Sequence, residues 1–200
     1  MLERLLDLRG TELGLDTYLD DFESCFWRVT ESWKLERQQT FSEPEVPSWM
    51  AMAEGDWATA LRLAEDMRPS IKGLQQRLDD HGITQNRVRI VEWPLSPYLW
   101  WELHVLRIRA EEGERIRVLD AAAVRPLEEA RELPEALVLG GRVAYVIRYD
   151  GVGVLDGARK LTDAQTIAAC HEEIAALHRQ GEDLLSFFPR EVARLSPPVV

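Results

Sequence analysis

The chain has 200 residues, 46% of them hydrophobic and 30% charged, which suits one domain with an ordinary core. Its formal net charge of −11 at pH 7 argues against binding to nucleic acid or to an anionic membrane surface, because both need clustered Lys and Arg. No stretch reaches the ~18 apolar residues of a membrane-spanning helix, and the charged start MLERLLDLRG lacks the apolar segment of a signal peptide. We therefore expect a cytoplasmic protein in which Cys25 and Cys170 are reduced thiols.

The first eighty residues predict several helices and one strand. A short terminal helix over 2–8 carries leucines at helical spacing, which suggests self-association as a homodimer. A second helix is expected over 16–29. The run Ser32–Phe41 alternates apolar and charged side chains, as a half-buried strand does, and a proline-broken loop follows it. An apolar helical stripe from Trp57 to Gly82 contains Pro69, which should kink the helix or begin a second one.

Residues 87–119 have the outline of a β-α-β unit. The β-rich run 88–91 comes first, and Ser96 then provides an N-cap for a helix with proline at its first position. Gly113 ends that helix and the β-rich run 116–119 follows. Two strands joined by a helix of this length should be parallel, with a right-handed crossover.

The last third predicts hairpins and a long helix. Two β runs, 137–139 and 142–149, are separated by a Gly-Gly hairpin signal. After the turn at Asp150-Gly151, residues 152–155 can pair with the previous run. A long helix is expected from Thr162 or Asp163, weakened at its Gly and ended or kinked at Pro189.

These elements predict an α/β fold, with α+β as the alternative. We expect a small mixed sheet that contains the β-α-β unit, with packed helices and added terminal helices. The whole chain, 1–200, should form a single α/β domain with peripheral termini at 1–15 and 190–200.

The carboxyl end of the first strand of the β-α-β unit is the expected ligand-binding rim, because open α/β sheets bind ligands at the carboxyl ends of their strands. This rim predicts a ligand-binding set made of Glu92, Trp93, Ser96, Tyr98 and Trp101. A structural charge paired with a nearby arginine is the alternative role for Glu92.

Lys34 and Glu36 share one face of the strand predicted over 32–41. A cation alternating with a carboxylate on an exposed strand face commonly reflects cross-strand charge pairing. If the face lines a cleft instead, both residues become ligand anchors, and Glu36 also becomes a candidate acid or base.

The chain contains no phosphate-loop, nucleophile-elbow or metal-binding motif, so neither a cofactor nor a metal is expected. If the protein is an enzyme, Glu36, Glu92, Glu102 or His104 would supply acid–base chemistry. Glu102 and His104 are two residues apart and cannot face each other on a helix, so a His–carboxylate dyad would need a partner from elsewhere.

Several short motifs occur in an order that resembles a known family. They are Lys34-Leu35-Glu36 with Phe41, Pro94-Leu95-Ser96 with Tyr98-Leu99 and Glu102, Gly113-Glu114, and the Asp150-Gly151 turn. Over residues 18–160 the chain resembles actinobacterial proteins grouped as domain of unknown function 6879. It departs from their pattern with Lys34 in place of Arg and Phe41 in place of Tyr. The resemblance implies a companion of helix-turn-helix regulators in developmental or specialised-metabolism gene sets.

Three functions remain open. The leading hypothesis is a non-catalytic binding or accessory regulatory protein that senses a small molecule or docks on a protein partner, with no role for nucleic acid or membrane. The second is an enzyme of bacterial specialised metabolism that uses carboxylate or histidine acid–base chemistry. The third is a structural homodimer held by its terminal helices.

Overall fold

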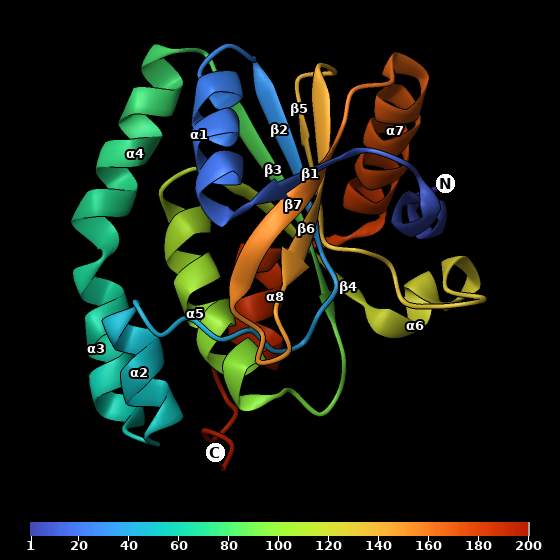
Figure 1. Ribbon diagram of the computed structural model, residues 1–200. Coiled ribbons are helices and arrows are strands. Elements are labelled where there is room, and N and C mark those ends of the chain that lie inside the picture. Colours follow the sequence, from blue (N-terminus) through green and yellow to red (C-terminus); the bar gives the residue numbers. More distant parts are fainter. Residues whose placement is uncertain (200) are drawn as a thin grey trace.

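The computed structural model describes residues 1–199, which form an α/β fold around one mixed sheet (Figure 1). The strand order is β1-β7-β6-β5-β2-β3-β4-β8. The strands are β1 (Thr11–Gly14), β2 (Glu31–Glu36), β3 (Thr84–Val91), β4 (Arg115–Asp120), β5 (Ala136–Leu139), β6 (Val143–Tyr149), β7 (Leu155–Leu161) and β8 (Glu182–Asp183). The α-helices are α1 (Leu15–Phe26), α2 (Pro47–Ala53), α3 (Trp57–Asp66), α4 (Arg68–Asp80), α5 (Pro97–Glu111), α6 (Ala121–Val124), α7 (Ala164–Gln180) and α8 (Leu184–Glu191), with 3-10 turns η1 (Leu2–Asp7) and η2 (Arg125–Leu127). Within residues 1–199, no helix combines the length and the apolarity needed to cross a bilayer.

The predicted β-α-β unit is confirmed, because β3 and β4 pair in parallel and α5 connects them. Ser96 caps α5 by accepting a hydrogen bond from the Leu99 N–H at 3.0 Å, and Pro97 occupies the first turn. β2 also pairs in parallel with β3, and the long connection between these two strands contains α2, α3 and α4. Pro69 lies in the first turn of α4, so the predicted apolar stripe is divided into two helices there.

The remaining strands are antiparallel to their neighbours, and some lie outside the predicted elements. The hairpin of β5 and β6 is confirmed, whereas β7 starts only at Leu155 and continues to Leu161. The turn before β7 is wider than predicted because the Asp150 carboxylate accepts the N–H groups of both Val152 and Val154. The sequence pattern predicts no strand at β1 or β8 and a loop at α2, whereas the structure forms both strands and this helix.

Helices cover both faces of the sheet (Figure 1). On one face, α7 packs on an apolar cluster that includes Leu35, Val88 and Ile90. Leu2 and Leu5 are buried in the same cluster, so the apolar side chains that suggested self-association pack inside the chain. The opposite face carries α1 and α5, and it holds the cleft described next.

Candidate functional site

Charged residues occupy the centre of the sheet on the face toward α1 and α5. Lys34 and Glu36 of β2 alternate with apolar residues that face α7, and Arg87 and Arg89 of β3 do the same. The parallel register places Lys34 beside Arg87 and Glu36 beside Arg89. Because side chains of a strand alternate between faces, β2 and β3 bring these four charged groups together on one face of the sheet.

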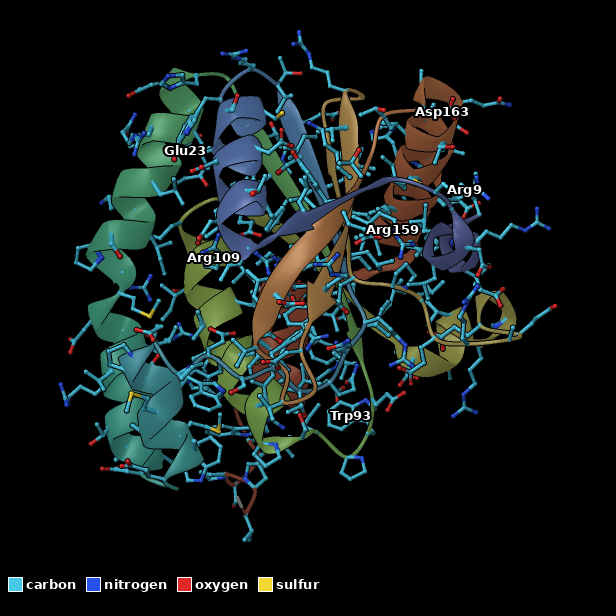
Figure 2. All side chains as sticks on the ribbon, in the orientation of Figure 1. Arg9, Glu23, Trp93, Arg109, Arg159 and Asp163 are labelled. Carbon is cyan, nitrogen blue, oxygen red and sulfur yellow. The ribbon has the colours of Figure 1, made fainter. Side chains whose placement is uncertain are left out.

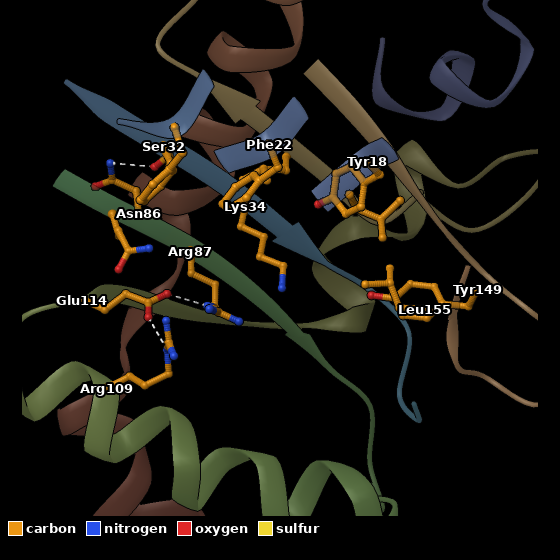
Figure 3. A pocket seen from close by; sticks show the side chains of 14 residues that line it. Tyr18, Phe22, Ser32, Lys34, Asn86, Arg87, Arg109, Glu114, Tyr149 and Leu155 are labelled. Atoms are coloured by element: carbon orange, nitrogen blue, oxygen red, sulfur yellow. Dashed lines mark hydrogen bonds and ion pairs between the residues drawn. The ribbon is translucent and has the colours of Figure 1, made fainter. Parts of the chain in front are cut away.

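A cleft with two lobes lies over these charges. The large lobe has a volume of about 490 Å³ and the small lobe about 230 Å³. The two lobes share five lining residues, which we call the waist: Lys34, Arg87, Arg109, Tyr149 and Leu155. Figure 3 shows the small lobe, in which the side chains of Lys34, Arg87 and Arg109 approach one another beneath the aromatic residues of α1.

An ion-pair chain of alternating charge connects the waist residues to two buried carboxylates. Lys34 Nζ lies 2.5 Å from Glu36 Oε1, and Arg87 Nη1 lies 2.7 Å from Glu36 Oε2. Arg87 Nε and Arg109 Nε lie 2.7 and 2.5 Å from the two oxygens of Glu114 (Figure 3). The carboxylate side chains are only 4% and 5% exposed, whereas Lys34 and Arg109 are 33% and 24% exposed. The ion-pair chain therefore begins and ends with a cation that reaches solvent.

Glu36 and Glu114, the two carboxylates of the ion-pair chain, stay ionised. Burial by itself would raise the pKa of Glu114, but the guanidinium groups of Arg87 and Arg109 outweigh burial and lower the pKa to about 2. Burial is likewise outweighed at Glu36, where Arg87, Lys34 and Arg89 hold the pKa well below its ordinary value. The charges of the cleft floor are thus set at neutral pH before any ligand arrives.

A second buried pair lies beneath the large lobe. Arg89 Nε lies 2.7 Å from Glu102 Oε2, and both side chains are almost fully buried. Tyr98 donates its hydroxyl to Glu43 Oε1 at 2.5 Å, and the same hydroxyl lies 3.4 Å from Glu102. Burial raises the pKa of Glu43, with the Tyr98 hydrogen bond opposing it. Within residues 1–199, Glu43 has no ion-pair partner, unlike the other carboxylates of the cleft.

Four aromatic rings form one wall of the large lobe. Tyr98 meets Phe41 edge-to-face with ring centroids 5.3 Å apart, and it meets Trp101 at 5.4 Å. Phe41 also packs on Tyr149 at 4.6 Å. Such contacts hold the rings in place, so this aromatic wall is formed in advance.

The structure brings five of the predicted site residues to the cleft: Lys34, Glu36, Tyr98, Trp101 and Glu102. The expected condition for Lys34 and Glu36, that their strand face lines a cleft, is met. His104 points elsewhere, because its Nδ1 lies 2.8 Å from the Trp100 carbonyl oxygen and its ring packs on Phe188.

The other residues of the expected rim at the carboxyl end of β3, which are Glu92, Trp93 and Ser96, do not line this cleft. The buried Arg37 side chain occupies that region and binds Glu128 at 2.6 Å and Glu92 at 2.7 Å. Ser96 is used as the helix cap, and its hydroxyl also donates to the Gln39 carbonyl. Trp93 is 45% exposed on the loop before α5, whereas Arg109 lies toward the other end of that helix (Figure 2).

Sequence reasoning missed several residues of the cleft: Phe41, Glu43, Arg87, Arg109, Glu114 and Tyr149. The alternation of arginine with apolar residues over 87–90 is a signal that points to Arg87 and Arg89. Glu43 lies on a proline-rich loop, where no periodic pattern distinguishes it.

The candidate site can hold a ligand through rings and fixed charges. Among residues 1–199, no group of three or more His, Cys, Asp or Glu side chains is placed to hold a metal ion.

The family model described as Domain of unknown function (DUF6879) matches residues 20–189. The chain belongs to this family. The DUF6879 match confirms the resemblance read from residues 18–160, and it continues through α7 into α8. Among curated proteins, none matches the sequence.

Proposed function

We propose that this DUF6879 protein is a non-catalytic binding protein that senses a small molecule in the cleft over β2 and β3. The cleft itself is the observation that carries the proposal. The large lobe, at about 490 Å³, falls in the range typical of small-molecule sites. Its aromatic wall and its few fixed charges also match the composition of such sites.

The state of the carboxylates favours binding over catalysis. A general base works best when its pKa lies near the working pH. Glu36 is paired with both Lys34 and Arg87, which outweigh burial and lower its pKa, and Glu102 is held in an ion pair by Arg89 although burial raises its pKa. Glu92 and His104, the other predicted acid–base residues, lie outside the cleft. The fixed charges therefore suit recognition of a ligand better than proton transfer.

The test uses a panel of small aromatic compounds that carry positive, negative or no charge, with binding followed by thermal shift and calorimetry. We expect at least one class to stabilise the protein in a saturable manner. Leu155→Trp should abolish this effect by filling the waist, because Leu155 lines both lobes. Val152→Trp is the matched control, since Val152 lies nearby in the β6–β7 turn but is 76% exposed. The proposal fails if no compound binds, or if Leu155→Trp binds as well as the control.

The hydrogen bond between Tyr98 and Glu43 favours one alternative function, an acid–base enzyme. Glu43 has a raised pKa and no ion pair within the described residues, whereas the pKa of Glu36 is lowered and Glu102 is paired with Arg89. Glu43 therefore suits proton transfer better than these two carboxylates. An enzyme should convert a bound compound into a product detected by mass spectrometry, and Glu43→Gln should abolish the conversion while binding is retained. Binding without any product would exclude this alternative for the compounds tested.

A further inference from the structure

We infer, building on the proposed function, that the ligand is a monoanionic aromatic carboxylate. Its carboxylate would lie at the waist between Lys34 and Arg109, with its ring against the aromatic wall of the large lobe. The inference rests on the charge balance of the waist, on its unused hydrogen-bond donors and on the position of the wall.

The ion-pair chain has a net charge of +1, because its cations outnumber its carboxylates by one. It contains the cations Lys34, Arg87 and Arg109 and only the two carboxylates of Glu36 and Glu114. Because the carboxylates are buried and the terminal cations are partly exposed, a ligand at the waist meets positive charge first. One negative charge on the ligand would complete the balance.

The waist also has donors without acceptors. An arginine offers five N–H donors and a lysine three. Within residues 1–199, Arg109 forms a hydrogen bond only through its Nε, which donates to Glu114, and the Lys34 ammonium forms an ion pair only with Glu36. The terminal nitrogens of a guanidinium match the two oxygens of a carboxylate in a bidentate contact. The waist therefore has the donors to hold a carboxylate without breaking its own ion pairs.

The surroundings select against a second negative charge and in favour of a ring. The ion-pair chain has an excess of a single positive charge, and the large lobe also contains the Glu43 carboxyl group, which accepts the Tyr98 hydroxyl and offers no cation to a second negative charge. Glu102 is already neutralised by Arg89. The wall made by Phe41, Tyr98, Trp101 and Tyr149 borders the same lobe, so an aromatic body attached to the carboxylate has a surface to pack on.

The test compares four probes that share a benzene ring: phenylacetate, 2-phenylethanol, 2-phenylethylamine and phenyl phosphate. Calorimetry at low salt should give the tightest binding for phenylacetate, by about tenfold or more over the alcohol, as a charge-assisted contact implies. Arg109→Gln should weaken phenylacetate by about tenfold and leave the alcohol unchanged. Arg107→Gln is the matched control, because Arg107 lies on the same helix, is 25% exposed and belongs to ion pairs outside the cleft.

Melting temperatures confirm that each variant is folded, and Lys34→Gln removes the other terminal cation if Arg109→Gln does not fold. Tighter binding of the amine, the alcohol or the phosphate would overturn the inference, as would equal losses in Arg109→Gln and Arg107→Gln. In those cases binding that is still blocked by Leu155→Trp would leave the proposed function intact. Binding of no probe would contradict both.

Discussion

Ionisation of Glu135, just before β5, should lower the free energy of unfolding as the pH rises from 4.5 to about 7, and Glu135→Gln should remove that cost. Its Oε1 accepts the N–H groups of Arg37 and Gln38 at 2.5 and 2.7 Å, whereas Oε2 has no partner within residues 1–199. Burial and the charge of Glu36 raise the pKa of Glu135 from 4.5 to about 7. Glutamine retains the accepting oxygen and cannot ionise.

The sign follows from proton binding. Between pH 4.5 and about pH 7, the unfolded chain has lost the Glu135 proton while the folded chain keeps it, so rising pH lowers the free energy of unfolding. Above pH 7 the loss is constant. The difference between the two pKa values corresponds to about 3 kcal/mol at 1.36 kcal/mol for each pKa unit.

Urea unfolding at pH 5, 6, 7 and 8 measures this effect as the difference between Glu135→Gln and the wild type. The variant should gain about 1 kcal/mol at pH 5 and about 3 kcal/mol at pH 8. Glu129→Gln, at an exposed glutamate of the same segment, should show no such trend. A stability difference that does not change with pH, or a variant less stable than the wild type at pH 8, would refute the reasoning.

Three further substitutions test a buried ion pair, a helix cap and a close backbone approach. Glu102→Leu leaves the fully buried guanidinium of Arg89 unpaired and should cost about 3–5 kcal/mol in urea unfolding; a loss under 1 kcal/mol would contradict the burial of this pair. Ser96→Ala removes the cap of α5 and should cost about 1 kcal/mol, whereas an unchanged midpoint would show that the cap is dispensable. Gly157→Ala should release β1, because Gly157 has φ +131° and an added Cβ would lie 2.2 Å from the Leu13 carbonyl oxygen. Amide exchange in β1 should then accelerate, and unchanged protection would argue against this close approach.

The parts of the fold that could be predicted are those with local signals. The β-α-β unit has its N-cap, Pro97 and Gly113 within one short segment, and the hairpin of β5 and β6 has its Gly-Gly turn. By contrast, β1 is a strand because it pairs with β7, far away in the chain, and four residues carry too little periodicity to show this. The two-residue β8 is formed by pairing with β4 in the same way.

The cleft could be predicted only in part for the same reason. The alternation over residues 32–36 placed Lys34 and Glu36 on one face, but their neighbours follow from the register with β3. That register brings Arg87 to Glu36, and α5 then adds Arg109 through Glu114. The rule that ligands bind at the carboxyl ends of strands favoured a different place, which the ion pairs of Arg37 occupy in this protein.

The indole N–H signals of the seven tryptophans test most directly whether the cleft is the binding site. Trp101 borders the large lobe, whereas Trp93 lies on an exposed loop beside Phe187 and Trp33 packs with His171 on the opposite face of the sheet. A ¹H–¹⁵N titration with phenylacetate, with Trp101→Phe to assign its signal, separates these positions. We predict a saturable shift of the Trp101 signal while those of Trp93 and Trp33 stay in place. Saturable movement of Trp93 with Trp101 unchanged would contradict a ligand site in this cleft, and no movement at all would contradict the binding of an aromatic carboxylate there.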